Sequence, residues 1–524
     1  MKRVFLVALL LGCSGCGNLI KNGGDGGEGV AAVQPSRVTP EQLRAAVSDP
    51  RLVRFYETRG WAPAWNSETA PALVGAIREA PRHALDPELF LGDVARAEAP
   101  AQREAALSLA ALTYADALAR GRVDPTRIAD VYTLPRPEVD VASGLNRALE
   151  GGDVPAWLAS LAPQDEEYRR LSEAFIAATR RGGPVATAVP EGGAIRPGGS
   201  DPRVPAIAAA LRAQGYAGAD AQPQAAQPAQ AGQNQQATQA APTTRYTEAL
   251  AAAVRALQED HGLEPTGVVD ARTLAALNAD TTNRARTLAV NLERRRWLAR
   301  QAPPTRIDVN IAGAYLTYWR DGNAADRRRV VVGQPGNGTP ELGSPMFRLV
   351  ANPTWTVPES IAEEEIIPKG AGYLARNNMT MQNGRIVQEP GPRNSLGLVK
   401  FDMRNDQAIY LHDTPAKALF QQDERHRSHG CVRVQDALGF ARLIAEQEGV
   451  LDQWQAASQK EDETFVQLPR EIPVRLMYQT AFLDGGRIRL RPDVYGWDEI
   501  VARALGLPAR TAGPTPTHVS DVGP

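Results

Sequence analysis

The spacing of apolar residues changes near Arg306, and this change divides the chain into two structural classes. Upstream, residues 38–180 carry apolar side chains at helical intervals of three and four. One such series is Leu107, Ala110, Ala111, Tyr114 and Leu118. Downstream, Ile307, Val309 and Ile311 alternate with polar residues, which is the period of a half-buried strand. The 524 residues allow about three domains, so the sequence predicts a multidomain α+β protein with a mostly-β domain last.

Stretches rich in Pro and Gly mark the expected boundaries between these parts. We expect a signal peptide (1–12), a flexible tether (13–37), a helical scaffold domain (38–202), a small three-helix domain (203–280), a connecting helix (281–304), a mostly-β domain (305–480) and a C-terminal extension with a flexible tail (481–524). Further strand-like runs in the mostly-β domain are residues 315–319, 330–332 and 347–350.

The small three-helix domain is interrupted by a segment of unusual composition. Residues 221–242 are almost entirely Ala, Gln and Pro, so we expect a disordered, Gln-rich insertion. Beyond the insertion, one helix face carries Leu250, Ala253, Val254 and Leu257. Gly262 is placed to end this helix, and Asp270 is placed to cap the next one.

The N-terminus has the features of an export signal. Lys2 and Arg3 precede a short apolar stretch, residues 4–11, which ends at Gly12. Residues 10–13 (LLGC) resemble a bacterial lipobox, in which the cysteine receives the lipid. We therefore expect Cys13 to anchor an exported, periplasmic lipoprotein in the outer membrane. Lipidation of Cys16, or cleavage without lipidation, are the alternatives.

Charge and cysteine content restrict the remaining possibilities. The formal net charge of −2 argues against a nucleic-acid partner, which normally requires a basic surface. Three cysteines are too few for a disulfide framework, and two of them lie in the export signal region. Cys431 is the one cysteine in the rest of the sequence.

The surroundings of Cys431 favour a reactive thiol. Three of the six histidines of the chain, His412, His426 and His429, lie within twenty positions upstream of Cys431. A thiol needs a base or a positive neighbour to attack at neutral pH, and Arg433 adds positive charge. The sequence therefore predicts a thiolate nucleophile at Cys431.

Three other interpretations of this cysteine remain open at this point. A buried structural cysteine is common, although apolar neighbours would then be expected. A zinc site formed by Cys431 and the three histidines fits the usual ligand spacings poorly. A papain-like hydrolase would place the cysteine before its histidine, whereas His412 precedes Cys431.

The motifs around these residues resemble the L,D-transpeptidase family with a YkuD catalytic domain. Residues 409–415 (IYLHDTP) and 428–434 (SHGCVRV) carry the catalytic signature. Residues 352–358, 391–397 and 291–297 resemble the large YcbB-like class, although Ser395 stands where proline is expected. The small three-helix domain resembles a peptidoglycan-binding domain through residues 254–258, 261–263, 267–270, 273–274 and 277–278. A helical connector that binds no ligand is the alternative for this domain.

The resemblance implies a role for each residue of the signature. Cys431 would be the nucleophile and His412 the general acid and base, with the imidazole held by a backbone carbonyl. His429 would have a supporting role, and backbone N–H groups at Gly430 and Cys431 would stabilise the oxyanion. Substrate contacts are expected from Arg433, Ser428, Arg425 and Trp355. No cofactor and no metal are implied.

The implied reaction is the 3→3 cross-linking of peptidoglycan. Donor tetrapeptides and the diaminopimelate side chain of an acceptor stem would be the substrates, and carbapenems would acylate Cys431. Residues 359–398 resemble the flap that caps the substrate in this class. The same acyl-enzyme could instead serve lipoprotein anchoring, D-amino acid exchange or L,D-carboxypeptidation. A catalytically inert wall-binding lipoprotein is the alternative from another functional class.

Overall fold

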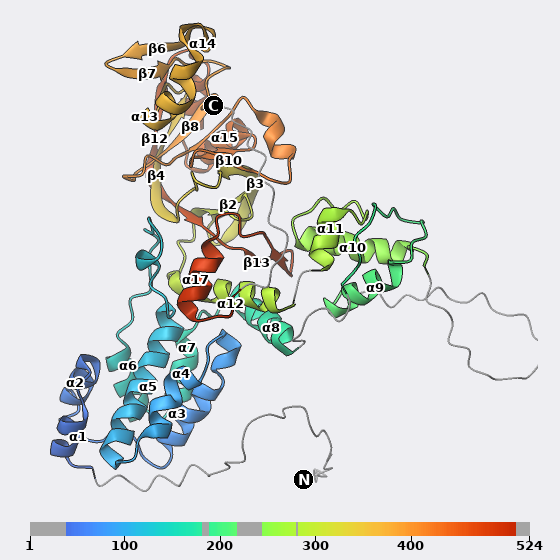
Figure 1. Cartoon of the computed structure of the whole chain (residues 1–524). Coiled ribbons are helices and arrows are strands. Elements are labelled where there is room, and N and C mark those ends of the chain that lie inside the picture. Colours follow the sequence, from blue (N-terminus) through green and yellow to red (C-terminus); the bar gives the residue numbers. More distant parts are fainter. Residues whose placement is uncertain (1–37, 181–187, 217–243, 279–280, 510–524) are drawn as a thin grey trace, which may run out of the picture.

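The computed structural model confirms the multidomain α+β organisation (Figure 1). It describes residues 38–180, 188–216, 244–278 and 281–509. The predicted signal peptide and tether, with Cys13 and Cys16, lie outside the described residues, as do the Gln-rich insertion and residues 510–524. Among the described residues, no helix combines the length and the apolar character needed to cross a membrane.

Eight helices and two short 3-10 turns form the helical scaffold at one end of the molecule. They are α1 (Pro40–Ala46), α2 (Pro50–Glu57), α3 (Thr69–Arg78), η1 (Ala80–His83), α4 (Glu88–Arg96), α5 (Pro100–Arg120), η2 (Pro125–Arg127), α6 (Val141–Glu150), α7 (Val154–Leu161) and α8 (Glu166–Arg180). The central helix α5 is rich in alanine and leucine, begins with Pro100 and ends at Gly121, which has a φ of 83°. The predicted apolar face of α5 is buried, as expected.

The small three-helix domain contains α9 (Val204–Ala213), α10 (Glu248–Asp260) and α11 (Ala271–Leu277). The predicted caps are confirmed, because Gly262 follows α10 with a φ of 72° and the Asp270 side chain accepts from the Thr273 N–H at 2.8 Å. Asp260, at the end of α10, forms ion pairs with Arg487 at 2.6 Å and Arg489 at 2.8 Å. These ion pairs connect the domain to the C-terminal part of the chain.

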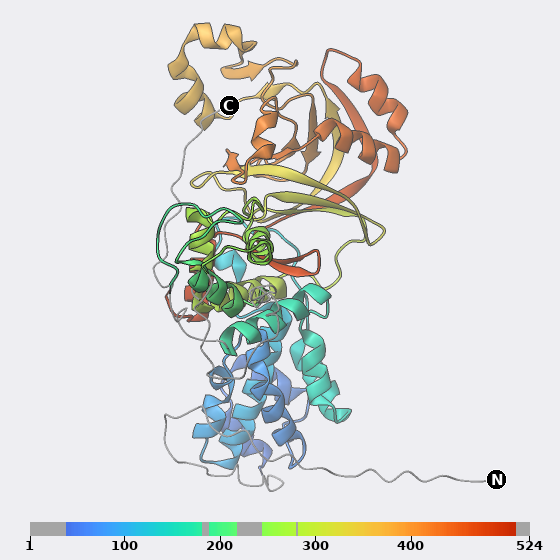
Figure 2. The ribbon, with the colours of Figure 1, turned by 90° about the vertical axis from the view of Figure 1, so that its right-hand side faces the viewer.

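Helix α12 (Thr281–Trp297) is more than a connector, because it belongs to the core of the scaffold. Leu288 and Leu292 are buried among the scaffold helices. The segment after the mostly-β domain also packs in this region, through β13 (Ala481–Asp484), β14 (Arg487–Leu490) and α17 (Trp497–Leu505). The two views place α12 between the scaffold helices and the mostly-β domain (Figures 1 and 2).

The mostly-β domain is built on a nine-stranded sheet whose order is β10-β3-β11-β9-β8-β4-β12-β1-β2. Strand β2 also pairs with β3, so the sheet closes on itself. The strands are β1 (Arg306–Asn310), β2 (Tyr315–Arg320), β3 (Asn323–Gly333), β4 (Leu342–Ala351), β8 (Val399–Met403), β9 (Leu411–His412), β10 (His426–Ser428), β11 (Val432–Val434) and β12 (Thr464–Met477). The runs 315–319, 330–332 and 347–350 fall within these elements, and the first predicted strand is confirmed except that β1 ends one residue before Ile311.

Two helices complete the core of this domain, α15 (Ala437–Gln447) and α16 (Leu451–Ser458), and a 3-10 turn, η5 (Lys417–Gln421), precedes β10. Phe440 of α15 is fully buried against Phe401 of β8, with ring centroids 5.4 Å apart. Burial of this apolar surface holds the strands that carry the candidate site.

Residues 359–398, called the flap below, form a separate small unit at the end of the molecule remote from the scaffold (Figures 1 and 2). The flap contains α13 (Glu359–Ile361), the π-helical turn η3 (Ala362–Ile366), η4 (Ile367–Lys369), α14 (Ala371–Arg376), β6 (Met379–Gln382) and β7 (Arg385–Gln388). β7 pairs with β6 and with β5 (Trp355–Thr356), which precedes the flap. Ile366, Met379 and Ile386 are buried in a small core of its own together with Trp355 and Val357.

Candidate active site

The pairing of β9 with β11 places the predicted catalytic residues together. The two strands run parallel, with Val432 opposite Leu411 and Arg433 opposite His412. Val432 and Leu411 are fully buried in the core of the domain. Because side chains alternate along a strand, Arg433 and His412 lie on the other face of the sheet.

The residues next to this pair share the same face. Cys431 immediately precedes β11, and Tyr410 immediately precedes β9. The Val432 N–H donates to the Tyr410 carbonyl at 3.1 Å, which keeps these two segments in register. The alternation therefore brings Cys431 and Tyr410 to the face that carries His412.

Cys431 is half-buried, and its thiol is not predisposed to ionise. Burial raises the pKa of the Cys431 thiol, while Tyr410, Lys400 and Arg433 act in the opposite direction. Its Sγ lies 3.7 Å from the Ala408 carbonyl oxygen. The nucleophilic thiolate predicted at Cys431 would therefore have to form by proton transfer to a base, because burial outweighs the positive neighbours in their effect on the thiol pKa.

His412 is buried and uncharged at neutral pH. Burial lowers the pKa of His412 to about 3, the positive charge of Arg433 adds to this shift, and the backbone carbonyl of Asp413 opposes it. The Nδ1 atom is buried and makes no hydrogen bond within the described part of the chain. A neutral imidazole can accept a proton, so His412 has the protonation state that a general base requires.

The turn before Cys431 is held by Ser428. The Ser428 hydroxyl donates to the Cys431 carbonyl at 2.6 Å and accepts from the Gly430 N–H at 3.2 Å. Gly430 has a φ of 117°, a conformation that side chains with a Cβ rarely adopt. Ser428 thus has a structural role in this turn, and the Gly430 N–H proposed for the oxyanion is engaged in the unliganded site.

Arg433 is a buried cation without a local partner. It is 6% exposed, and its Nε is buried without a hydrogen-bond partner among the described residues. Burial lowers the pKa of Arg433, while the charges of Cys431 and Glu365 raise it. An unpaired buried charge is costly, which favours a ligand carboxylate as its partner.

His429 points toward the flap rather than toward Cys431. Its Nε2 lies 2.5 Å from Oε1 of Glu365, on η3 of the flap. Oε2 of the same carboxylate is buried and has no partner in the described structure. The sequence analysis missed Glu365, because a run of three glutamates, 363–365, is typical of a solvated helix face.

Tyr410 is the second residue that the sequence analysis missed. The pKa of its hydroxyl is raised well above the usual value, first by burial and then by the charge of Cys431, while a hydrogen bond from Trp355 lowers it. The Lys400 Nζ lies 4.4 Å from the centre of the Tyr410 ring. Tyr410 lies two residues before His412, and side chains two positions apart on a strand share one face. This spacing could have identified Tyr410 from the sequence. Trp355 is itself buried in the small flap core.

Two residues singled out in the sequence, Arg425 and His426, make hydrogen bonds to backbone carbonyls. The Arg425 guanidinium donates to the carbonyls of Gln422 at 2.7 Å, Ala314 at 3.1 Å and Val330 at 3.2 Å, so it has a structural role, and its substrate-binding role stays a prediction. His426 Nε2 lies 3.0 Å from the Ile311 carbonyl oxygen, which turns this histidine away from Cys431. Over the described residues, no three His, Cys, Asp or Glu side chains are placed to hold a metal ion.

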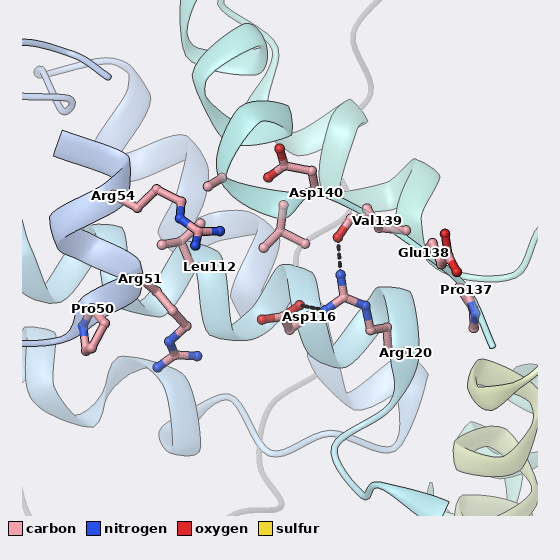
Figure 3. Close-up of a pocket in the computed structure, with 12 residues that line it drawn as sticks. Pro50, Arg51, Arg54, Leu112, Asp116, Arg120, Pro137, Glu138, Val139 and Asp140 are labelled. Atoms are coloured by element: carbon pink, nitrogen blue, oxygen red, sulfur yellow. Dashed lines mark hydrogen bonds and ion pairs between the residues drawn. The ribbon is translucent and has the colours of Figure 1, made fainter. Parts of the chain in front are cut away.

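A cavity of about 680 Å³ lies in the scaffold, between α2, α5 and the start of α6 (Figure 3). Its charges are partly paired, because Arg120 forms an ion pair with Asp116 at 2.9 Å and a hydrogen bond with the Val139 carbonyl. A second cavity, of about 880 Å³, lies where α12 meets β1 and β2. Neither cavity includes a residue of the candidate active site.

Three family models match separate parts of the chain. Residues 304–451 match the "L,D-transpeptidase catalytic domain", residues 50–175 match a "Scaffold domain" and residues 200–277 match a "Putative peptidoglycan binding domain". The residues of the β9–β11 face fall within the first of these matches.

One similar protein is a "Putative L,D-transpeptidase" of Haemophilus influenzae, 32% identical over 218 residues. The match covers 37% of this chain and 44% of that protein, so the chain spans less than half the length of this relative.

Solved L,D-transpeptidases also align with the chain. One from Stackebrandtia nassauensis is 11% identical over 58% of this chain and 100% of its own, with a TM-score of 0.22. Another, residues 123–326 of the protein from Xylanimonas cellulosilytica, is 16% identical over 55% of this chain and 99% of its own, with a TM-score of 0.19. Scores this low carry no structural argument.

The family expected from the sequence motifs is confirmed by the matched models and by the Haemophilus relative. The chain carries an L,D-transpeptidase catalytic domain of the YkuD family, together with a scaffold domain and a peptidoglycan-binding domain.

Proposed function

We propose that this protein is a peptidoglycan L,D-transpeptidase that forms 3→3 cross-links through a thioester on Cys431. The observation that carries this proposal is the register of β9 and β11, which puts Cys431, His412 and Arg433 on one face of the sheet. A nucleophile, a neutral base and a buried cation are the three groups that acyl transfer from an anionic peptide requires.

In the first step, the thiol of Cys431 attacks the carbonyl carbon between diaminopimelate and the terminal D-Ala of a donor tetrapeptide. Thiol and imidazole are both uncharged at rest, so His412 accepts the thiol proton as the S–C bond forms. The imidazolium then donates that proton to the leaving nitrogen. The C–N bond breaks, D-Ala departs and the thioester remains.

In the second step, the side-chain amine of diaminopimelate on a neighbouring stem attacks the thioester. His412 takes the proton from this amine, the amide bond forms and the C–S bond breaks. The proton returns to the sulfur, which restores the Cys431 thiol. The product is a peptide bond between two diaminopimelate residues.

Two groups beside Cys431 are suited to negative charge on the substrate. Arg433 would bind a carboxylate of the stem peptide, since it has no partner within the described residues. Backbone N–H groups of the 430–431 turn would stabilise the oxyanion, once the Gly430 N–H leaves the Ser428 hydroxyl. Each such donor contributes roughly 3 kcal/mol to acyl transfer.

The other parts of the chain fit an enzyme that works at the cell wall. The flap would cover the bound peptide and slow hydrolysis of the thioester. The peptidoglycan-binding domain would hold the enzyme near its substrate. The lipobox-like sequence at Cys13 supports a periplasmic protein anchored in the outer membrane, and carbapenems would inhibit it by acylating Cys431.

Intact-protein mass spectrometry with a carbapenem tests this proposal. We expect one covalent adduct on the wild type and none on Cys431→Ala. Purified tetrapeptide muropeptides should then yield 3→3 dimers with the wild type only. Absence of adduct and of dimers in the wild type would instead support a wall-binding protein without catalysis. Monomeric tripeptides as the sole product would indicate carboxypeptidation.

A further inference from the structure

The flap places a carboxylate in the candidate active site. Oε1 of Glu365 lies 2.5 Å from His429 Nε2, and this contact fixes the orientation of the carboxylate. Oε2 is buried and has no hydrogen-bond partner in the described part of the chain. Buried carboxylate oxygens are nearly always paired, so a missing partner for Oε2 points to a ligand that donates hydrogen bonds.

Arg433, in the same site, carries the opposite charge to Glu365. Its side chain is 6% exposed, and the buried Nε has no acceptor among the described residues. The charge of Glu365 is close enough to raise the pKa of Arg433, yet the two side chains form no ion pair. A half-buried carboxylate with a buried, unpaired Oε2 and a buried cation thus occur in one site without forming an ion pair with each other.

We propose that Glu365 binds the ammonium group of the diaminopimelate side chain, while Arg433 binds the carboxylate on the same carbon. This inference rests on the proposed function and extends it to the recognition of the side chain. The side chain of diaminopimelate ends in a carbon that carries both an ammonium and a carboxylate. Separate anionic and cationic groups in one site are complementary to such a zwitterion, and an uncharged or singly charged side chain would leave one of them unpaired.

The ammonium group can come from the donor stem or from the acceptor stem, because both contain diaminopimelate. On the donor, Glu365 would orient the residue whose carbonyl is attacked. On the acceptor, it would position the amine that later attacks the thioester. The two half-reactions separate these sources.

The test compares Glu365→Gln with Glu364→Gln, using the full chain. Glutamine can still hydrogen-bond to His429, so the first variant removes the charge and keeps the local contact. Glu364 is an exposed neighbour in the same helical turn and serves as the matched control. We expect Glu365→Gln to lower formation of 3→3 dimers by about 10- to 100-fold, the usual range for losing a hydrogen bond to a charged group. We expect Glu364→Gln to resemble the wild type.

Acylation by nitrocefin, a β-lactam without a cationic group, distinguishes this inference from the proposed function. We expect the same acylation rate in the wild type and in Glu365→Gln. If the wild type itself is not acylated, the proposed function fails. If acylation is lost only in Glu365→Gln, the residue acts by holding His429, and the recognition role is overturned.

A donor tetrapeptide with an acetylated diaminopimelate amine identifies the source of the ammonium. If release of D-Ala from this donor falls in the wild type and not further in Glu365→Gln, the donor ammonium is the ligand. If D-Ala release is unaffected and resolution of the thioester by an unmodified acceptor is slowed only in Glu365→Gln, the acceptor ammonium is the ligand. If acetylation slows both proteins by the same factor in both half-reactions, Glu365 does not bind the ammonium.

Discussion

Two groups of buried charges in this molecule differ in how completely they are paired. The first lies on α12, at the centre of the scaffold, where Arg296 is fully buried. Its guanidinium donates to the His83 carbonyl at 2.8 Å, to the Tyr168 hydroxyl at 2.9 Å and to Glu293 at 2.5 Å. The second lies in the active site. Nε is unpaired in both arginines, but among the described residues Arg433 makes none of the hydrogen bonds that Nη1 and Nη2 of Arg296 make.

Two buried histidines, His83 and His412, also differ in how completely they are hydrogen-bonded. Burial lowers the pKa of both His83 and His412 to about 3. His83 Nδ1 lies 3.0 Å from the Tyr168 hydroxyl, whereas Nδ1 of His412 has no hydrogen bond to any residue that the structure describes. His83 and His412 are therefore similar in burial and in pKa, and they differ in whether Nδ1 has a hydrogen-bond partner. Within the candidate site, polar atoms without a protein partner are available for a substrate.

The largest expected effect concerns the two histidines. His412→Ala should lower acylation of Cys431 by about 10²- to 10⁴-fold, because the general base is removed. Thermal unfolding should change less than in His83→Ala, since Nδ1 of His412 has no hydrogen bond to lose in the described part of the chain. His83→Ala is the matched control and should lower the melting temperature while leaving acylation near the wild-type rate. Loss of acylation in both variants to the same extent would contradict the distinction.

The two buried arginines provide the next largest effect. Arg296→Met leaves Glu293 buried without its cation, and we expect the free energy of unfolding to fall by about 3–5 kcal/mol. Arg433→Met removes a buried charge that has no partner, so unfolding should be unchanged or slightly harder, while tetrapeptide turnover is lost. Denaturant unfolding and D-Ala release measure the two properties. A large loss of stability in Arg433→Met would show that this guanidinium holds the fold.

Much of this organisation can be predicted from the sequence. Helical and strand periods locate the elements, and the caps at Gly262 and Asp270 occur where the sequence places them. Cys431 and His412 share a motif whose residues are close in the chain, and parallel pairing of β9 and β11 brings them to one face. Local patterns were therefore sufficient for the fold class, while the roles of Cys431 and His412 stay predictions that come from the family resemblance.

The remaining features depend on contacts between distant segments. Glu365 comes from the flap, more than sixty residues before His429, and nothing in its own neighbourhood indicates an active-site residue. Arg425 was expected to bind substrate because it lies near Cys431 in sequence, but its guanidinium is directed to backbone carbonyls. The raised pKa of Cys431 follows from burial, which a sequence does not give.

Arg425 provides a smaller test of the same distinction, because it is a paired arginine close to the site. Arg425→Gln removes hydrogen bonds to the carbonyls of Gln422, Ala314 and Val330. We expect the free energy of unfolding to fall by about 1–3 kcal/mol, with KM for the tetrapeptide unchanged. A rise in KM without loss of stability would instead restore the substrate-binding role predicted from the sequence.

The smallest expected effect is the pH dependence of acylation. Protonation of His412 removes the base, so the rate falls as the pH drops through its pKa, and that pKa is lowered to about 3. The raised pKa of Cys431 moves ionisation of the thiol to alkaline pH. Neutral thiol and neutral imidazole thus coexist across the intermediate range, and acylation by nitrocefin should vary less than about threefold between about pH 5 and 8.

A resting thiolate–imidazolium pair would give a different profile, with the rate rising through the pKa of the thiol and falling as the imidazolium loses its proton. His429 also lies in the site. His429→Gln is therefore the control for this measurement. If the acylation rate of His429→Gln still falls below about pH 6.5, His412 has the pKa of an exposed histidine. Burial would then not lower the pKa of His412.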